Sequence, residues 1–164
     1  MRTTGIIVAD AARARFITFE PSREPDQDGK DRCVEHADLV NPEAGTARRE
    51  RSGDRPGRLH ASRGGPAHLA DDHRQRHQEE VERRFAKRIL DAAAPFLGQH
   101  RLRHLLLIAA PRLLGSLRAE LAGRHLRDVQ IVEMNEDHSR RSLSQIAELV
   151  VQRQLLGGAA SAVA

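Results

Sequence analysis

The sequence predicts one α/β domain with a mixed sheet, because it combines short apolar runs with a later change to helical periodicity. Its 164 residues are enough to bury one hydrophobic core. Hydrophobic residues make up 39% of the chain, but Trp and Tyr are absent and Phe occurs only four times. Aliphatic side chains and alanine must therefore fill the core. We expect the domain to cover residues 1–156, with a frayed tail over 157–164.

Three strands are expected before the first long helix. Residues 5–9 form a continuous apolar run, which is typical of a strand covered on both faces. Residues 15–20 (RFITFE) form a second strand and the hairpin partner of the first. A third strand over 34–40 ends at the turn signal Asn41-Pro42.

The second half of the chain alternates helices with strands. Apolar residues recur at helical spacing over 71–97, and Gly98 suits the C′ position that ends such a helix. A buried strand is expected over 105–109, and Pro111 then opens a helix that ends near Gly123. The final strand covers residues 129–134.

A capping box, Ser142 to Gln145, opens the last predicted helix. The predicted order is therefore βββ-loop-α-βα-βα. Hairpins join the leading strands, and right-handed crossovers join the two βα units. This layout of a mixed five-stranded sheet between helices is that of the ribonuclease H-like three-layer class.

Residues 41–70 form a long loop with neither helical nor strand periodicity, which in a compact domain is usually functional or disordered. Between positions 45 and 65 it carries six arginines against Glu50 and Asp54, so its excess of +4 equals the net charge of the whole chain. The predicted anion-binding residues of this loop are Arg48, Arg49, Arg51, Arg55, Arg58, Arg63, Gly64 and Gly65. Guanidinium groups bind phosphate in a bidentate manner, and glycine lets backbone N–H groups approach an anion. A solvated, flexible loop is the alternative.

Arg112, in the first turn after Pro111, is a further candidate anion ligand, because the free N–H groups of a helix start attract phosphate. The alternative is a helix start that only packs on the sheet. Asp10 ends the first strand, where a ribonuclease H-like nuclease keeps a metal-binding aspartate, but the sequence favours a role in the turn or a salt bridge with Arg13 or Arg15. His73 and His77 have metal-ligand spacing but lack a third ligand.

The sequence predicts no cofactor and no membrane segment. The apolar run over 5–9 is shorter than the roughly 7–15 residues of a signal peptide or the about 20 of a membrane span. The single cysteine, Cys33, excludes an internal disulfide. We therefore expect a cytoplasmic protein.

Four short motifs carry a family resemblance. They are IVADAARAR over 7–15, VNPEA over 40–44, SGDRPGR over 52–58 and AAPRLLGSLR over 109–118. Together they resemble the bacterial host attachment protein family, and the match runs from the first strand to the last helix. That family is similar to the middle domain of archaeal and eukaryotic class I peptide chain release factors, which implies the same α/β topology.

In those release factors a Gly-Gly-Gln loop precedes a long basic helix and enters the peptidyl-transferase centre of the ribosome. Gly64 and Gly65 correspond to the two glycines here, but Pro66 occupies the glutamine position. Proline has no amide side chain to position a water and no backbone N–H. The resemblance thus implies contact with the ribosome or structured RNA without peptide release.

The leading hypothesis is a non-enzymatic protein that binds RNA or the ribosome through its arginine-rich loop. Two alternatives stay open. One is a metal-dependent phosphodiesterase or hydrolase that uses Asp10 or the His73/His77 pair. The other is a protein-interaction module for an acidic partner, which includes attachment to a host.

Overall fold

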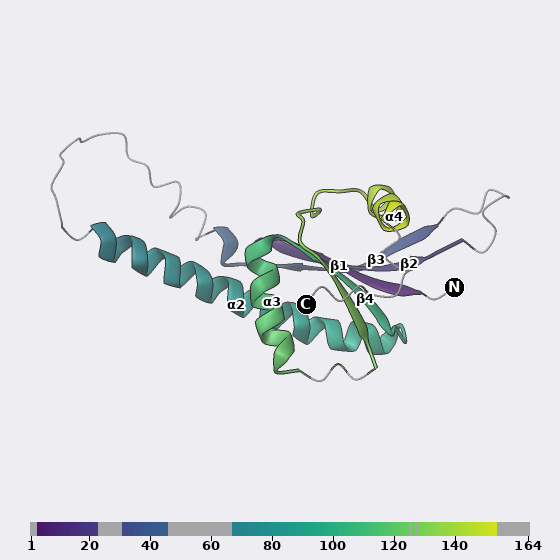
Figure 1. The fold of residues 1–164 in the computed structure, drawn as a ribbon, viewed down its shortest axis with the longest axis horizontal. Coiled ribbons are helices and arrows are strands. Elements are labelled where there is room, and N and C mark those ends of the chain that lie inside the picture. Colours follow the sequence, from purple (N-terminus) through teal and green to yellow (C-terminus); the bar gives the residue numbers. More distant parts are fainter. Residues whose placement is uncertain (1–2, 23–30, 46–66, 125, 127, 154–164) are drawn as a thin grey trace.

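The computed structural model describes residues 3–22, 31–45, 67–124, 126 and 128–153, which form an open five-stranded mixed sheet flanked by helices (Figure 1). The strands are β1 (Thr4–Ala9), β2 (Arg13–Glu20), β3 (Arg32–Val40), β4 (His104–Ala109) and β5 (Gln130–Met134). The helices are α2 (Ala67–Gln99), α3 (Pro111–Ala122) and α4 (Leu143–Gln152). The predicted α/β class with a mixed sheet is confirmed, and the ribonuclease H-like assignment stays a prediction.

The sheet has the strand order β3-β2-β1-β4-β5. The strands β1, β2 and β3 pair antiparallel, whereas β1, β4 and β5 pair parallel. Ile7 in the central strand β1 lies between Phe16 of β2 and Leu107 of β4. The apolar runs predicted as buried strands thus occupy the middle of the sheet, where both faces are covered.

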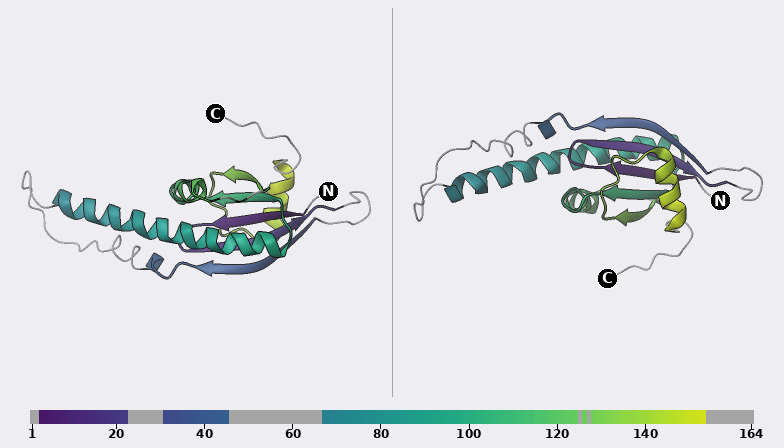
Figure 2. Two further views of the ribbon diagram at one scale, coloured as in Figure 1. Left: turned by 90° about the horizontal axis from the view of Figure 1, so that it is seen from below. Right: turned by 90° about the horizontal axis from the view of Figure 1, so that it is seen from above.

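Helices cover the two faces of the sheet unequally (Figure 2). The helices α2 and α3 pack on one face, in a core that includes Phe16, Phe85 and Leu114. The helix α4 packs on the other face, in a core that includes Phe19 and Ile146. Each strand therefore contributes alternate side chains to two separate apolar layers.

Helix α2 is longer at both ends than its apolar periodicity predicted. It begins at Ala67, so the last four residues of the predicted loop over 41–70 are helical. It also passes through Pro95 and through Gly98, so Gly98 is not the residue that ends it. Instead Arg101 takes the left-handed conformation, with φ of 51°, one turn later. The helix ends where the chain must turn to enter β4 beside β1, and tertiary pairing thus sets its length.

Two predicted helix starts are confirmed. Pro111 is the first residue of α3, where its missing N–H costs no hydrogen bond. Ser142 caps α4 by accepting from the backbone N–H of Gln145, whose side chain accepts in turn from the N–H of Ser142. This reciprocal pair is the capping box expected from the sequence.

None of the helices in the described part of the chain combines the length and the apolar character needed to cross a bilayer.

Candidate functional site

One end of the sheet brings together Asp10 and Arg112, two of the residues that the sequence singled out. The carboxyl ends of β1, β3, β4 and β5 meet there with the start of β2, as the pairs Ala9–Ala109, Arg13–Val40 and Ile108–Met134 establish. We call this end the rim. In open α/β sheets, ligands bind outside the carboxyl ends of the parallel strands. The rim is therefore the first place to look for a functional surface.

Asp10 stands at the rim and builds the turn between β1 and β2. Its Oδ1 accepts hydrogen bonds from the backbone N–H groups of Ala12, at 2.7 Å, and Arg13, at 2.8 Å. Its own N–H donates to the carbonyl of Arg13 at 2.9 Å. The carboxylate of Asp10 thus forms an Asx turn, which is the alternative to metal binding that the sequence left open.

Asn41 locks the end of β3 onto that same turn. It is buried, its Nδ2 donates to the carbonyl of Ala11 at 2.9 Å, and its backbone N–H donates to the carbonyl of Ala12 at 2.7 Å. Its Oδ1 accepts from the N–H of Glu43 at 3.2 Å. The sequence indicated only a turn signal here. The adjacent Pro42-Glu43 was the available clue that the asparagine side chain would serve a fixed turn.

Two arginines of α2 tie this turn to the helix. Arg84 pairs with Glu43 at 2.6 Å, and Arg88 donates a long hydrogen bond of 3.4 Å to the carbonyl of Val40. All of these side chains are well exposed or half-buried, so each contact adds little stability. Their effect is directional, because they hold the chain after Asn41 against the middle of α2.

The amino-terminal part of α2 extends past the rim (Figures 1 and 2). Every side chain over 72–80 is exposed or half-buried, and Val81 is the first buried one in this described stretch. Side-chain pairs three or four residues apart stabilise it, such as Asp72–Arg76 at 2.9 Å and Glu80–Arg83 at 3.1 Å. A helix that is polar all round is either held by such pairs or positioned for a partner.

His73 and His77 lie on this projecting part of α2, and both are exposed. Asp10 lies at the rim, on a different element. No cluster of three His, Cys, Asp or Glu side chains suited to a metal ion occurs within the described residues. Two carboxylates on and after β5 have other partners: Glu133 pairs with Arg118, and Asp137 accepts from the N–H and the hydroxyl of Ser139. These bonds from Ser139 also lower the pKa of Asp137.

Arg112 lies at the rim in the first turn of α3, next to the strand end that pairs with β1. Its side chain is exposed and forms no ion pair with any acid in the described ranges. Ala110, at the N-cap, offers no side-chain cap to the free N–H groups of the helix. The structure thus brings Arg112 and Asp10 to one edge, as the shared strand ends require. Anion binding by Arg112 stays a prediction.

The remaining predicted anion ligands, from Arg48 to Gly65, lie outside the described residues. Their surroundings are nevertheless defined on both sides. The described chain stops at Gly45, just after the locked turn at Asn41, and resumes at Ala67, the first residue of the projecting helix.

Cys33 on β3 is half-buried against the α4 core. Burial, together with the negative charge of Asp31, raises the pKa of its thiol to about 11. The thiolate is therefore scarce at neutral pH, and a reactive cysteine is not indicated here.

The chain is thus a small α/β domain with an open mixed sheet. At its rim, Asp10 and Asn41 fix a turn beside a projecting polar helix. The chain belongs to the family described as proteins required for attachment to host cells, whose family model matches residues 5–150. A comparison with curated proteins gave no match. Of the four motifs that resemble this family, three lie at the rim, namely those over 7–15, 40–44 and 109–118.

Proposed function

We propose that this host attachment family member binds structured RNA, with the ribosome as its natural partner, through the arginine-rich segment over 48–63. One observation carries the proposal. The six arginines and two acids between positions 45 and 65 account for the entire net charge of +4, so the rest of the chain is balanced. A charge excess confined to one segment is the electrostatic signature of a polyanion partner.

The geometry around this segment supports the proposal. The segment leaves from a turn that Asn41 fixes with three hydrogen bonds, and it returns into a helix that projects beyond the sheet. Arg112 stands at the same rim without an acidic partner in the described chain. The arginine-rich segment, joined at one end to the turn at Asn41 and at the other to α2, suits contact with the surface of a large, folded polyanion.

The chemistry of the segment favours the sugar–phosphate backbone over the bases. Arginine binds phosphate oxygens in pairs, and such contacts carry no sequence information. The chain has no Trp or Tyr on which bases stack. We therefore propose recognition of shape and charge, as expected for structured RNA.

The proposed activity is binding without catalysis. Pro66 stands where release factors carry their glutamine, and proline can neither position a water through an amide nor donate from its backbone. We accordingly propose that the chain does not release peptides. A ribosomal partner also agrees with the cytoplasmic location expected from the sequence.

The test is an RNA-binding titration of the full chain with a structured ribosomal RNA fragment at low salt. The variant replaces four segment arginines with alanine, namely Arg48, Arg49, Arg51 and Arg55. The matched control removes four exposed cations elsewhere, namely Arg32, Lys87, Arg140 and Arg141. We expect the first variant to bind at least about tenfold more weakly than the control, since each lost phosphate contact weakens binding at low salt. Equal loss in both variants would show that only net charge matters, and would reject the segment as the site.

A second candidate combines the family description, which names attachment to host cells, with the basic segment: contact with an acidic protein. The same basic segment would serve it, because carboxylates also accept bidentate contacts from arginine. Treatment with nuclease separates the two candidates. A partner that stays bound to the chain after RNA is digested favours the protein contact, and a partner lost with the RNA favours the main proposal.

A further inference from the structure

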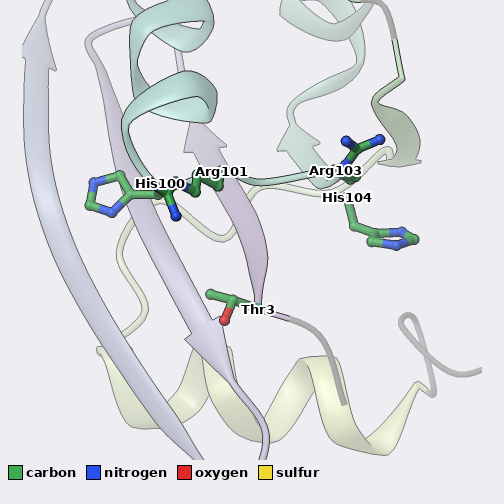
Figure 3. Close-up of a pocket in the computed structure, with 5 residues that line it drawn as sticks. All are labelled: Thr3, His100, Arg101, Arg103 and His104. Carbon is green, nitrogen blue, oxygen red and sulfur yellow. The ribbon is translucent and has the colours of Figure 1, made fainter.

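The end of the sheet opposite the rim carries a basic pocket that the proposed function does not use. The turn from α2 into β4 and the chain just before β1 border an open hollow of about 490 Å³. Its lining residues are Thr3, His100, Arg101, Arg103 and His104. Figure 3 shows His100 and Arg101 on one side, Arg103 and His104 on the other, with the two imidazole rings directed away from each other, and Thr3 below them just before β1. Four of the five side chains are cationic or can become so, and the fifth is a hydroxyl donor.

Neither guanidinium group in this pocket is neutralised within the described residues. Arg101 and Arg103 are exposed and have no carboxylate within ion-pair distance there. Asp128 lines the two adjoining hollows together with Arg103, but it forms no ion pair with it. By contrast, Arg124 on the neighbouring surface pairs with Asp91 at 2.6 Å. An anion in the pocket would therefore meet positive charge that no carboxylate among the described residues neutralises.

The backbone at Arg101 takes the left-handed conformation that glycine usually supplies at the end of a helix. The N–H of Leu102 donates to the carbonyl of Leu97 at 2.9 Å, and the N–H of Arg101 to that of Gly98 at 3.2 Å. This is a Schellman motif with Arg101 at the left-handed C′ position, where glycine is usual. An arginine there costs conformational energy that glycine would avoid. Of the residues described, Arg101 and Asp128 are the non-glycine ones with positive φ, and both line one hollow.

His100 is held in place by aromatic neighbours. Its ring lies 4.1 Å from the ring of His36 and 5.2 Å from that of Phe96. His36 in turn makes a hydrogen bond of 2.8 Å with the hydroxyl of Thr18. The imidazole at the pocket edge is thus positioned before any ligand arrives, which lowers the entropy cost of binding.

An apolar hollow of about 470 Å³ adjoins the basic one and shares Arg101 and Arg103 with it. Its apolar lining consists of Ala94, Leu97, Leu102, Leu126 and Val129. A basic pocket beside an apolar one suits a ligand with an anionic group at one end and an uncharged ring or chain at the other.

From these observations we infer that the α2–β4 turn is a binding site for a phosphomonoester. Arg101 and Arg103 hold the phosphate, Thr3 donates to it beside the fixed ring of His100, and the adjoining hollow takes the uncharged body. This site is independent of the arginine-rich segment, because it lies at the other end of β1 from the rim. A nucleic-acid phosphate has the same chemistry, so the test must separate a small ligand from RNA.

The experiment is an NMR titration of the isotope-labelled full chain with inorganic phosphate, with AMP and with an RNA hairpin. We expect AMP to shift the backbone signals of residues 97–104 and to bind more tightly than phosphate alone. Shifts in this region with the RNA hairpin but not with AMP would assign the pocket to a nucleic-acid phosphate and overturn the small-ligand site. No shift with any of the three probes would overturn the site altogether.

Arg101→Gly separates binding from folding, because glycine relieves the strained backbone. We expect this variant to keep or raise the thermal midpoint while AMP binding weakens about tenfold, the loss of one charge-assisted pair. Asp128→Gly is the matched control: it also relieves a positive φ, and AMP binding should stay equal or become tighter. AMP binding that survives both Arg101→Gly and Arg103→Ala would contradict the inference.

Discussion

Arg15 and Glu35 form a two-pronged ion pair across neighbouring strands of the sheet. Nε of Arg15 lies 3.1 Å from Oε1 of Glu35, and Nη2 lies 2.7 Å from Oε2. The third nitrogen, Nη1, donates to the carbonyl of Arg141 at 2.7 Å, in the loop that leads from β5 into α4. One buried guanidinium therefore joins β2 and β3 to the segment that leads into α4.

Glu35→Gln should destabilise the protein, because it leaves the buried guanidinium of Arg15 without its counter-charge. The Arg15 side chain is 9% exposed and that of Glu35 is 27% exposed, so we expect a loss of about 1–3 kcal/mol rather than the larger cost of a fully buried pair. The control, Asp38→Asn, breaks the exposed pair with Arg13 and should cost less than about 1 kcal/mol. Urea denaturation at neutral pH measures both.

The same pair predicts an acid-dependent stability. The hydrogen bonds from Arg15 hold the pKa of Glu35 below its usual range, although desolvation opposes this. Since the folded-state pKa is lowered, the stabilisation is complete above the unfolded value of about 4.3 and is lost as the pH falls through the folded one. Denaturation midpoints of the wild type should therefore fall more steeply below pH about 4.3 than those of Glu35→Gln. Parallel curves would contradict this assignment.

Asn41→Ala should cost about 1–3 kcal/mol, because it removes the two side-chain hydrogen bonds to the carbonyl of Ala11 and from the N–H of Glu43, each worth about 0.5–1.5 kcal/mol. Asn135 is exposed at the same rim, so Asn135→Ala is the control and should change stability little. Chemical denaturation compares the two variants. Equal stabilities would show that the turn at Asn41 does not depend on its side chain.

Two glycine substitutions should have opposite signs. A methyl group on Gly5 would lie 3.0 Å from Leu102 and 3.2 Å from Phe96, so Gly5→Ala should destabilise by about 1–3 kcal/mol through overpacking. Gly115, within α3, has open space around the same position, and Gly115→Ala should stabilise by about 0.5–1 kcal/mol through helix propensity. Thermal midpoints that moved in the same direction would refute the packing argument.

Ser142→Ala should remove the capping box of α4 and cost about 0.5–2 kcal/mol. Ser144→Ala, two residues further along the same helix, removes an exposed hydroxyl and should have a far smaller effect. The difference between the two denaturation midpoints isolates the cap. No difference would mean that packing of α4 alone defines its start.

Sequence reasoning succeeded where local chemistry decides the structure. Pro111 and the pair Ser142–Gln145 predict helix starts because their effects reach only a few residues along the chain. The run over 5–9 predicts a buried strand through its apolar composition. It failed at the end of α2. Gly98 looked like the C′ residue, but the position falls on Arg101 because the helix must reach the start of β4. Neither residue type nor spacing carries that information.

In the candidate site, too, the sequence predicts what local chemistry decides and misses what depends on tertiary packing. Strand ends placed Asp10 and Arg112 at one edge, as parallel strands require. The contacts of Asn41 with Ala11, and of Arg15 with Arg141, join positions far apart along the chain. Such bonds depend on how the elements pack, so they follow only from the fold.

Co-sedimentation with ribosomes across a salt series is the most direct test of the claim that the arginine-rich segment binds a polyanion. If the arginines over 48–63 bind phosphates, log affinity should fall with log salt concentration with a slope near −5 for about six contacts on a duplex. Alanine at Arg48, Arg49, Arg51 and Arg55 should make that slope shallower by about 3–4. Wild-type chain that stays in the supernatant at low salt, or a slope that the substitutions leave unchanged, would contradict the account.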